Sequence, residues 1–288
     1  MELFLYAMIF IMGTVFGSFF TLAVYRLPIG EDITHKHSFC PNCEHKLGLF
    51  DLIPIWSYLF LGGKCKYCKK PISIRYFILE VLSGIVFVVF AYSLRINLYQ
   101  IEIAKWIYLG FGILYFSGLF LIAGIDKEKV TIQRSVLLYG ILVTFAYVVY
   151  LASTGVAQIS YYLPYLLIIG ILAGIDTYLL RKKIKDSYPI EILLLCFIMI
   201  LFTGELVFIL TVIFTLLCIA THMILHSIQS KIEKQKGKGK KKEENTVKQQ
   251  KQEGQTILAI QRLPIGFYLC ITNIALLIFV NLLANYLP

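Results

Sequence analysis

The sequence has few charged residues. Aspartate, glutamate, lysine and arginine make up 15% of its 288 residues, whereas hydrophobic residues make up 58% and the mean hydropathy is +0.76. This composition excludes an ordinary soluble domain and predicts a polytopic membrane protein. The start of the chain also lacks the lysine or arginine of a signal peptide, because Glu2 stands there, and no small-x-small cleavage site cleanly ends the first apolar run. We expect that run to be a retained helix.

Long apolar stretches predict an all-α fold with about eight transmembrane helices, since about 20 residues are needed to cross a bilayer. The run from Pro189 to about Leu225 is too long for one crossing, and Thr203-Gly204-Glu205 divides it into two spans, of which the first is short. The other six stretches lie near residues 3–25, 76–94, 104–125, 135–153, 158–180 and 266–287.

Lysine and arginine are concentrated in alternate loops. They are frequent in residues 26–75, 126–134 and 181–185, and scarce in the turns near 95–105, 153–157 and 203–205. Because cations in short loops stay in the cytoplasm, the three basic loops should face the cytoplasm and both termini should lie outside.

A second basic segment, residues 230–261, contains nine lysines among glutamine, glutamate and glycine. We expect a mostly disordered cytoplasmic loop, with attraction to anionic lipid headgroups as an alternative role, and no nucleic-acid partner. The predicted domains are thus a first transmembrane helix (1–25), a cytoplasmic four-cysteine domain (26–75), a transmembrane core (76–229), the basic loop (230–261) and a last transmembrane helix (262–288).

Four of the seven cysteines form two Cys-x2-Cys pairs in the first cytoplasmic loop: Cys40, Cys43, Cys65 and Cys68. A two-residue spacer lets a tight turn aim two sulfurs at one ion, so the pattern predicts a tetrahedral zinc site in a small ribbon-like domain. Four thiolates leave no open position for water, which favours a structural zinc. Two disulfides are the alternative, and the expected cytoplasmic location argues against them.

Several acids lie at the cytoplasmic ends of the apolar stretches. Asp126 ends the third span, Asp176 lies near the end of the fifth, and Asp186 and Glu191 lie on either side of the start of the sixth. Two carboxylates that meet at one membrane face could perform aspartic-protease chemistry, one ionised to activate water and the other protonated to polarise a carbonyl. The alternative is that these are helix-end carboxylates paired with neighbouring lysines.

The order of motifs resembles that of the type IV prepilin leader peptidases, which are bacterial membrane aspartic peptidases. The resemblance rests on the following residues: Gly17-Ser18-Phe19, Arg26-Leu27-Pro28, Cys40-Pro41-x-Cys43, Asp51-x-Ile53-Pro54, Leu61-x-Gly63-x-Cys65-x-x-Cys68, Ile72-Ser73-x-Arg75-Tyr76, Glu80, Asp126 with Ile132, and Arg262-Leu263-Pro264-Ile265-Gly266. It implies a multi-pass protein of the bacterial plasma membrane that cleaves the short basic leader of pilin-like precursors at the cytoplasmic face. It also implies that Asp126 is catalytic and allows a second activity, N-methylation with S-adenosylmethionine.

The family's second catalytic acid lies in a Gly-x-Gly-Asp motif, which does not occur in this chain. Asp186, in the equivalent loop, is the first candidate, Asp176 the second and Glu191 a distant third. Glu80 is expected either to serve methyl transfer or contact the substrate's N-terminus, or to pair with Arg75. Two other functions remain open: a pilus or competence assembly factor that has lost catalysis, and a membrane methyltransferase on the same scaffold.

Overall fold

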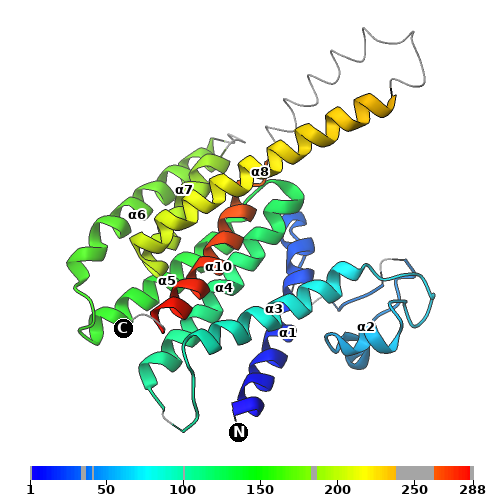
Figure 1. The fold of residues 1–288 in the computed structure, drawn as a ribbon, viewed down its shortest axis with the longest axis horizontal. Coiled ribbons are helices and arrows are strands. Elements are labelled where there is room, and N and C mark those ends of the chain that lie inside the picture. The colour runs from blue at the N-terminus through cyan, green and yellow to red at the C-terminus, as the bar shows by residue number, and fades with distance from the viewer. Residues whose placement is uncertain are drawn as a thin grey trace.

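The fold is a bundle of apolar helices with a small domain between the first two of them, as seen in a computed structural model (Figure 1). The structure describes residues 2–33, 37–40, 42–99, 101–182, 187–237 and 263–285. Within these ranges it contains no β-strand, only the two isolated bridges Phe39–Lys46 and Lys64–Pro71. The expected all-α membrane protein is confirmed.

In the described part of the chain, seven helices are long and apolar enough to cross a membrane, and an eighth, α7 (Tyr188–Thr203), is apolar but shorter. Gly204, with φ of +81°, ends α7 and divides the long apolar run where the sequence predicted. The seven long helices are α1 (Glu2–Arg26), α3 (Ile74–Ser93), α4 (Ile103–Lys129), α5 (Arg134–Ser153), α6 (Ile159–Arg181), α8 (Glu205–Gly237) and α10 (Ile265–Ala284).

The helix α8 extends further than the sequence predicted. It continues to Gly237, so the first eight residues of the expected loop 230–261 are helical. The remainder of that loop, from residue 238 on, lies outside the described residues.

The central helix of the bundle is α4, which packs against α1, α5 and α10. Its polar side chains are satisfied between helices, because the Tyr115 hydroxyl donates to Asn273 Oδ1 over 2.8 Å and the Asn273 amide donates to Thr211 over 3.1 Å. Hydrogen bonds of this kind join helices where the surroundings offer no water. These hydrogen bonds thus link α4, α10 and α8 in the interior of the bundle.

Close packing of small residues joins α1 to α3. A Cβ added at Gly13 would lie 2.7 Å from the Gly84 Cα, and one added at Gly17 would lie 2.8 Å from the Glu80 Cα. The Ser83 hydroxyl also donates to the Gly13 carbonyl over 2.8 Å. Small residues let two membrane helices approach to backbone contact, which fixes the two ends of the intervening domain.

That domain, residues 30–73, contains the 3-10 turn η2 (Leu49–Leu52) and the short helix α2 (Trp56–Phe60); a further turn, η1 (Leu27–Ile29), precedes it. Arg26 is 2% exposed, and its guanidinium donates to the carbonyls of Asp32 and His37 over 3.1 Å each. The Arg-Leu-Pro motif therefore holds the start of the domain against the end of α1.

Candidate active site and metal centre

The four cysteines of the cytoplasmic loop converge on one point. Their sulfur atoms all lie within 4.8 Å of one another, and Cys40 Sγ is 3.9 Å from Cys68 Sγ. Tetrahedral zinc with bonds of about 2.3 Å would place its sulfurs about 3.8 Å apart, whereas a disulfide needs about 2.05 Å. The cluster fits a four-thiolate metal site, and all seven cysteines of the chain are free.

The two Cys-x2-Cys turns have the same backbone geometry. In each, the first cysteine N–H donates to the carbonyl five residues on, and its carbonyl accepts from the N–H four residues on. The residue after the second cysteine has a positive φ, 56° at Glu44 and 59° at Lys69. The two turns thus share one backbone conformation, each is closed by one isolated β-bridge, and their cysteine sulfurs point at a common centre.

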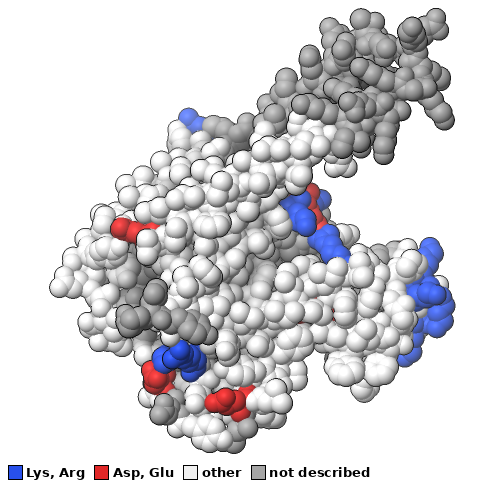
Figure 2. Space-filling view, in the orientation of Figure 1, with Lys and Arg blue, Asp and Glu red and all other residues white. Residues whose placement is uncertain are grey.

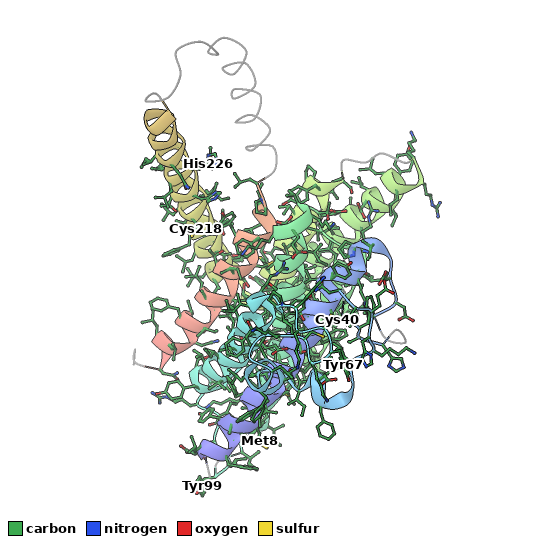
Figure 3. All side chains as sticks on the ribbon, turned by 90° about the vertical axis from the view of Figure 1, so that its right-hand side faces the viewer. Met8, Cys40, Tyr67, Tyr99, Cys218 and His226 are labelled. Atoms are coloured by element: carbon green, nitrogen blue, oxygen red, sulfur yellow. The ribbon has the colours of Figure 1, made fainter. Side chains whose placement is uncertain are left out.

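The second turn also favours thiolate. Backbone N–H groups of Cys68 and Tyr67 point at the Cys65 sulfur and lower the pKa of that thiol to about 7. The ring of Tyr67 contacts the ring of His45 from the first turn, with the two rings tilted and their centroids 3.5 Å apart; Figure 3 labels Tyr67 and Cys40 of this domain. A metal held here would thus join the two halves of the domain.

Glu80 binds the domain rather than Arg75. Its Oε2 accepts the Ile55 N–H over 2.7 Å, while Arg75 forms an ion pair with Glu128 at the end of α4. The expected alternative of a Glu80–Arg75 pair is therefore wrong, because the Glu80 carboxylate binds the loop backbone and the Arg75 guanidinium binds another acid. Ile55 has φ of 64° and ψ of −56°, and the next N–H donates to the Pro54 carbonyl, which is a strained γ-turn.

Asp126 lies against the first turn of α10. Its Oδ2 accepts the Phe267 N–H over 2.9 Å, and its Oδ1 accepts the Tyr188 hydroxyl over 2.9 Å. Tyr188 Oη in turn accepts the N–H groups of Ile265 (3.1 Å) and Gly266 (3.4 Å). A helix N-terminus offers unpaired N–H groups and a positive dipole end, so it suits an ionised carboxylate. Asp126 is fully buried there.

Gly266 leaves the space that Asp126 occupies. A Cβ at Gly266 would lie 3.1 Å from Asp126 Oδ2 and 3.4 Å from the Ile132 side chain. Ile132 is itself buried, six residues after Asp126, where the chain has turned back at Val130. The Asp-x5-Ile and Pro-Ile-Gly stretches of the sequence are thus two sides of one contact.

Asp176 belongs to a second cluster. Arg134 at the start of α5 donates to both of its oxygens, over 2.6 Å and 3.1 Å, and to the Ser187 hydroxyl over 3.0 Å. Glu191 accepts from Ser187 over 2.9 Å and lies 3.7 Å from the Arg134 Nε. Both acids are engaged with one arginine, so they match the expected alternative of paired carboxylates, with arginine in place of lysine.

The structure therefore brings a tyrosine, and not one of the described acids, into hydrogen-bond contact with Asp126. Asp186 lies outside the described residues. Sequence reasoning overlooked Tyr188 and Arg134. Arg134 could have been noticed as a cation at the start of an apolar span, on the same side of the membrane as the acids. Nothing in the sequence pointed to Tyr188.

Comparison with known proteins agrees with this architecture. Residues 11–94 match the family model described as the Bacterial Peptidase A24 N-terminal domain. The N-terminal part of the chain is similar to that family. The match covers most of α1, both cysteine pairs and α3, and together with the curated relatives it confirms the predicted resemblance to the type IV prepilin peptidases.

Curated relatives carry the name "Prepilin leader peptidase/N-methyltransferase". The protein from Klebsiella pneumoniae is 33% identical over 126 residues, which is 42% of this chain and 51% of the relative. The one from Bacillus subtilis is 40% identical over 81 residues (28% and 33%), and the one from Myxococcus xanthus is 38% identical over 79 residues (27% and 24%). The chain thus spans about a quarter to a half of the length of these relatives. No solved structure matches.

Proposed function

We propose that this multi-pass bacterial membrane protein is a prepilin leader peptidase that cleaves the basic leader of pilin-like precursors at the cytoplasmic face. The observation that carries the proposal is the setting of Asp126. A carboxylate at the cytoplasmic end of a membrane helix, fixed by an amide and a phenol, is an oriented general base, and its place matches the catalytic acid that the resemblance implies.

The second acid of the proposal is Asp186. In the sequence it precedes Tyr188, the residue that contacts Asp126, by two positions. Asp176 is the weaker candidate, since its carboxylate is paired with the Arg134 cation, whereas the partners of Asp126 are a neutral phenol and a backbone amide.

In the proposed reaction, Asp126 takes a proton from water while Asp186, protonated, donates a hydrogen bond to the scissile carbonyl. The oxygen of that water forms the new C–O bond, and the proton held by Asp126 then passes to the leaving amine as the C–N bond breaks. The products are a carboxylate on the leader and a free amine on the mature pilin.

The proposal assigns a structural zinc to Cys40, Cys43, Cys65 and Cys68. The sulfur separations and the closed set of four thiolates support zinc, and no step of the hydrolysis passes through it. N-methylation, with S-adenosylmethionine as methyl donor, enters the proposal as the second activity in the relatives' name and rests on the relatives alone.

The cytoplasmic location is supported by the distribution of cations. Outside residues 230–262, most of the lysines and arginines lie in the domain between α1 and α3, the α4–α5 turn and the end of α6. These three segments lie at the same end of the bundle, because successive helices alternate in direction. The candidate domains are the ranges stated above, with the basic loop beginning after Gly237 instead of at residue 230.

The test is leader cleavage of a prepilin-like precursor by the purified protein in detergent. Wild type, Asp126→Asn, Asp186→Asn and Asp176→Asn are compared at matched folded content. We expect the first two variants to be inactive and the third to cleave. If folded wild type cleaves none of the precursors from its own organism, the assembly-factor alternative replaces the peptidase.

A further inference from the structure

The domain between α1 and α3 exposes a cluster of large apolar side chains. They surround the short helix α2, and their exposed fractions are high: Phe50 85%, Ile53 41%, Trp56 60%, Leu59 56% and Phe60 81%. Trp56 and Phe60 stack on each other with ring centroids 5.8 Å apart. A cavity of about 410 Å³ opens among Phe50, Ile53, Trp56 and Phe60, and Asp51 and Lys66 also line it. We call this set the α2 surface.

The depth of α2 along the bundle can be read from two contacts with α3. Tyr58 stacks on Phe77, with centroids 5.2 Å apart, and the Ile55 N–H binds Glu80. Glu80 is six residues after Ile74, or about 9 Å along the helix axis. Because α3 has 20 residues, about the length of one crossing, its first two turns lie at the edge of the hydrocarbon layer. The α2 helix is therefore level with the membrane boundary, not above it.

Lysines accompany this surface. Lys46, Lys64, Lys66, Lys69 and Lys70 are all exposed in the same domain. In the shared orientation of Figures 1 and 2, lysine and arginine side chains gather at the right-hand tip of the domain, while α2 lies along its lower side. Aromatic and aliphatic side chains beside lysines are typical of segments that lie in the interface of an anionic membrane.

We propose that the α2 surface lies in the cytoplasmic interface of the bilayer, with Trp56 and Phe60 inserted at the headgroup and acyl boundary and the lysines on anionic headgroups. The occupant is the lipid bilayer, because the contacts with Phe77 and Glu80 fix α2 at that level and the charge is complementary to anionic lipid. The domain then has three attachments to the membrane: α1, α3 and the α2 surface.

The experiment uses the two native tryptophans, Trp56 and Trp106. The Trp106→Phe protein is placed in nanodiscs of anionic phospholipid, and its remaining emission reports on Trp56 alone. Trp56→Phe is the matched control, because Trp106 lies in the first turn of α4 within a candidate span. Brominated lipids quench from the membrane, and iodide quenches from water.

We expect brominated lipid to quench Trp56 emission about as strongly as that of Trp106, with iodide having little effect. The quenching should weaken when zwitterionic lipid replaces the anionic lipid. Strong quenching of Trp56 by iodide and none by brominated lipid would overturn the proposal. Protection of Trp56 only after a prepilin peptide is added would also overturn it and assign the surface to substrate.

Discussion

Replacing Asp176 by Asn separates a structural role for this acid from a catalytic one. The Asp176 side chain is 7% exposed and binds Arg134 through two hydrogen bonds. An Asn side chain there would still accept one hydrogen bond, and Arg134 would still contact Ser187 and Glu191. The free energy of unfolding should therefore fall by about the value of one charged hydrogen bond, about 1.5–3 kcal/mol.

Removing the arginine should cost more. In Arg134→Gln the two acids, each 7% exposed, would lose their shared cation, and an unpaired buried charge costs about 3–5 kcal/mol. The Arg134 side chain is one third exposed, so water would offset part of that cost and the lower end of the range applies. We therefore expect Arg134→Gln to destabilise the protein more than Asp176→Asn does.

The assay is equilibrium unfolding in mixed micelles, followed by leader cleavage at a temperature where all variants are folded. The double variant Arg134→Gln with Asp176→Asn completes the cycle and should be less destabilised than the sum of the single changes. Equal costs for the two single variants would contradict the shared-cation argument. Loss of cleavage in folded Asp176→Asn would make Asp176 the second acid and refute the assignment to Asp186.

Four further results are expected. Tyr188→Phe removes the hydroxyl that binds Asp126 and should lower kcat about 10-fold to 100-fold with little change in KM, since a charged hydrogen bond contributes about 1.5–3 kcal/mol; an unchanged kcat in a cleavage assay would show that the phenol does not orient the base. Gly266→Ala places a methyl 3.1 Å from Asp126 Oδ2 and should lower cleavage, whereas Gly110→Ala in open space should not, as measured with the same precursor. Cys40→Ser should reduce the zinc content of the purified protein from about one ion per chain, the capacity of one four-thiolate site, and elemental analysis checks this. Lys69→Gly relieves a φ of 59° and should slow zinc loss to a chelator, while Lys70→Gly, beside it and without a positive φ, should speed it; the reverse order would contradict the strain argument.

The parts of this structure that follow local rules could be predicted from the sequence. The membrane helices come from apolar runs of sufficient length, and the cysteine cluster comes from a spacing that only a tight turn satisfies. The break at Gly204 follows from a residue that adopts a positive φ at no steric cost. In each case the determining residues lie within a few positions of one another in the chain.

The contacts around Asp126 could not be predicted in the same way. Tyr188 reaches Asp126 across 62 positions and Phe267 across 141, and apolar patterning does not say which faces of membrane helices meet. The Arg75–Glu128 pair was overlooked for the same reason, because Glu80 offered a partner nearer in sequence. Helix-to-helix contacts in a bundle depend on rotation and tilt, which the sequence leaves open.

The zinc domain is connected to Asp126 through strained and charged contacts. Ile55 keeps its γ-turn only because its surroundings fix it, and those surroundings include Glu80 on α3 and Tyr58 against Phe77. From the start of α3, Arg75 pairs with Glu128, two residues after Asp126 on α4. Lys66 and Tyr67, in the second cysteine turn, contact Asp51 in the same domain, so we expect loss of metal to loosen the domain and its hold on α3. If the proposed function holds, a structural zinc would affect cleavage without taking part in the hydrolysis, by fixing the helix end that carries Asp126, the proposed base.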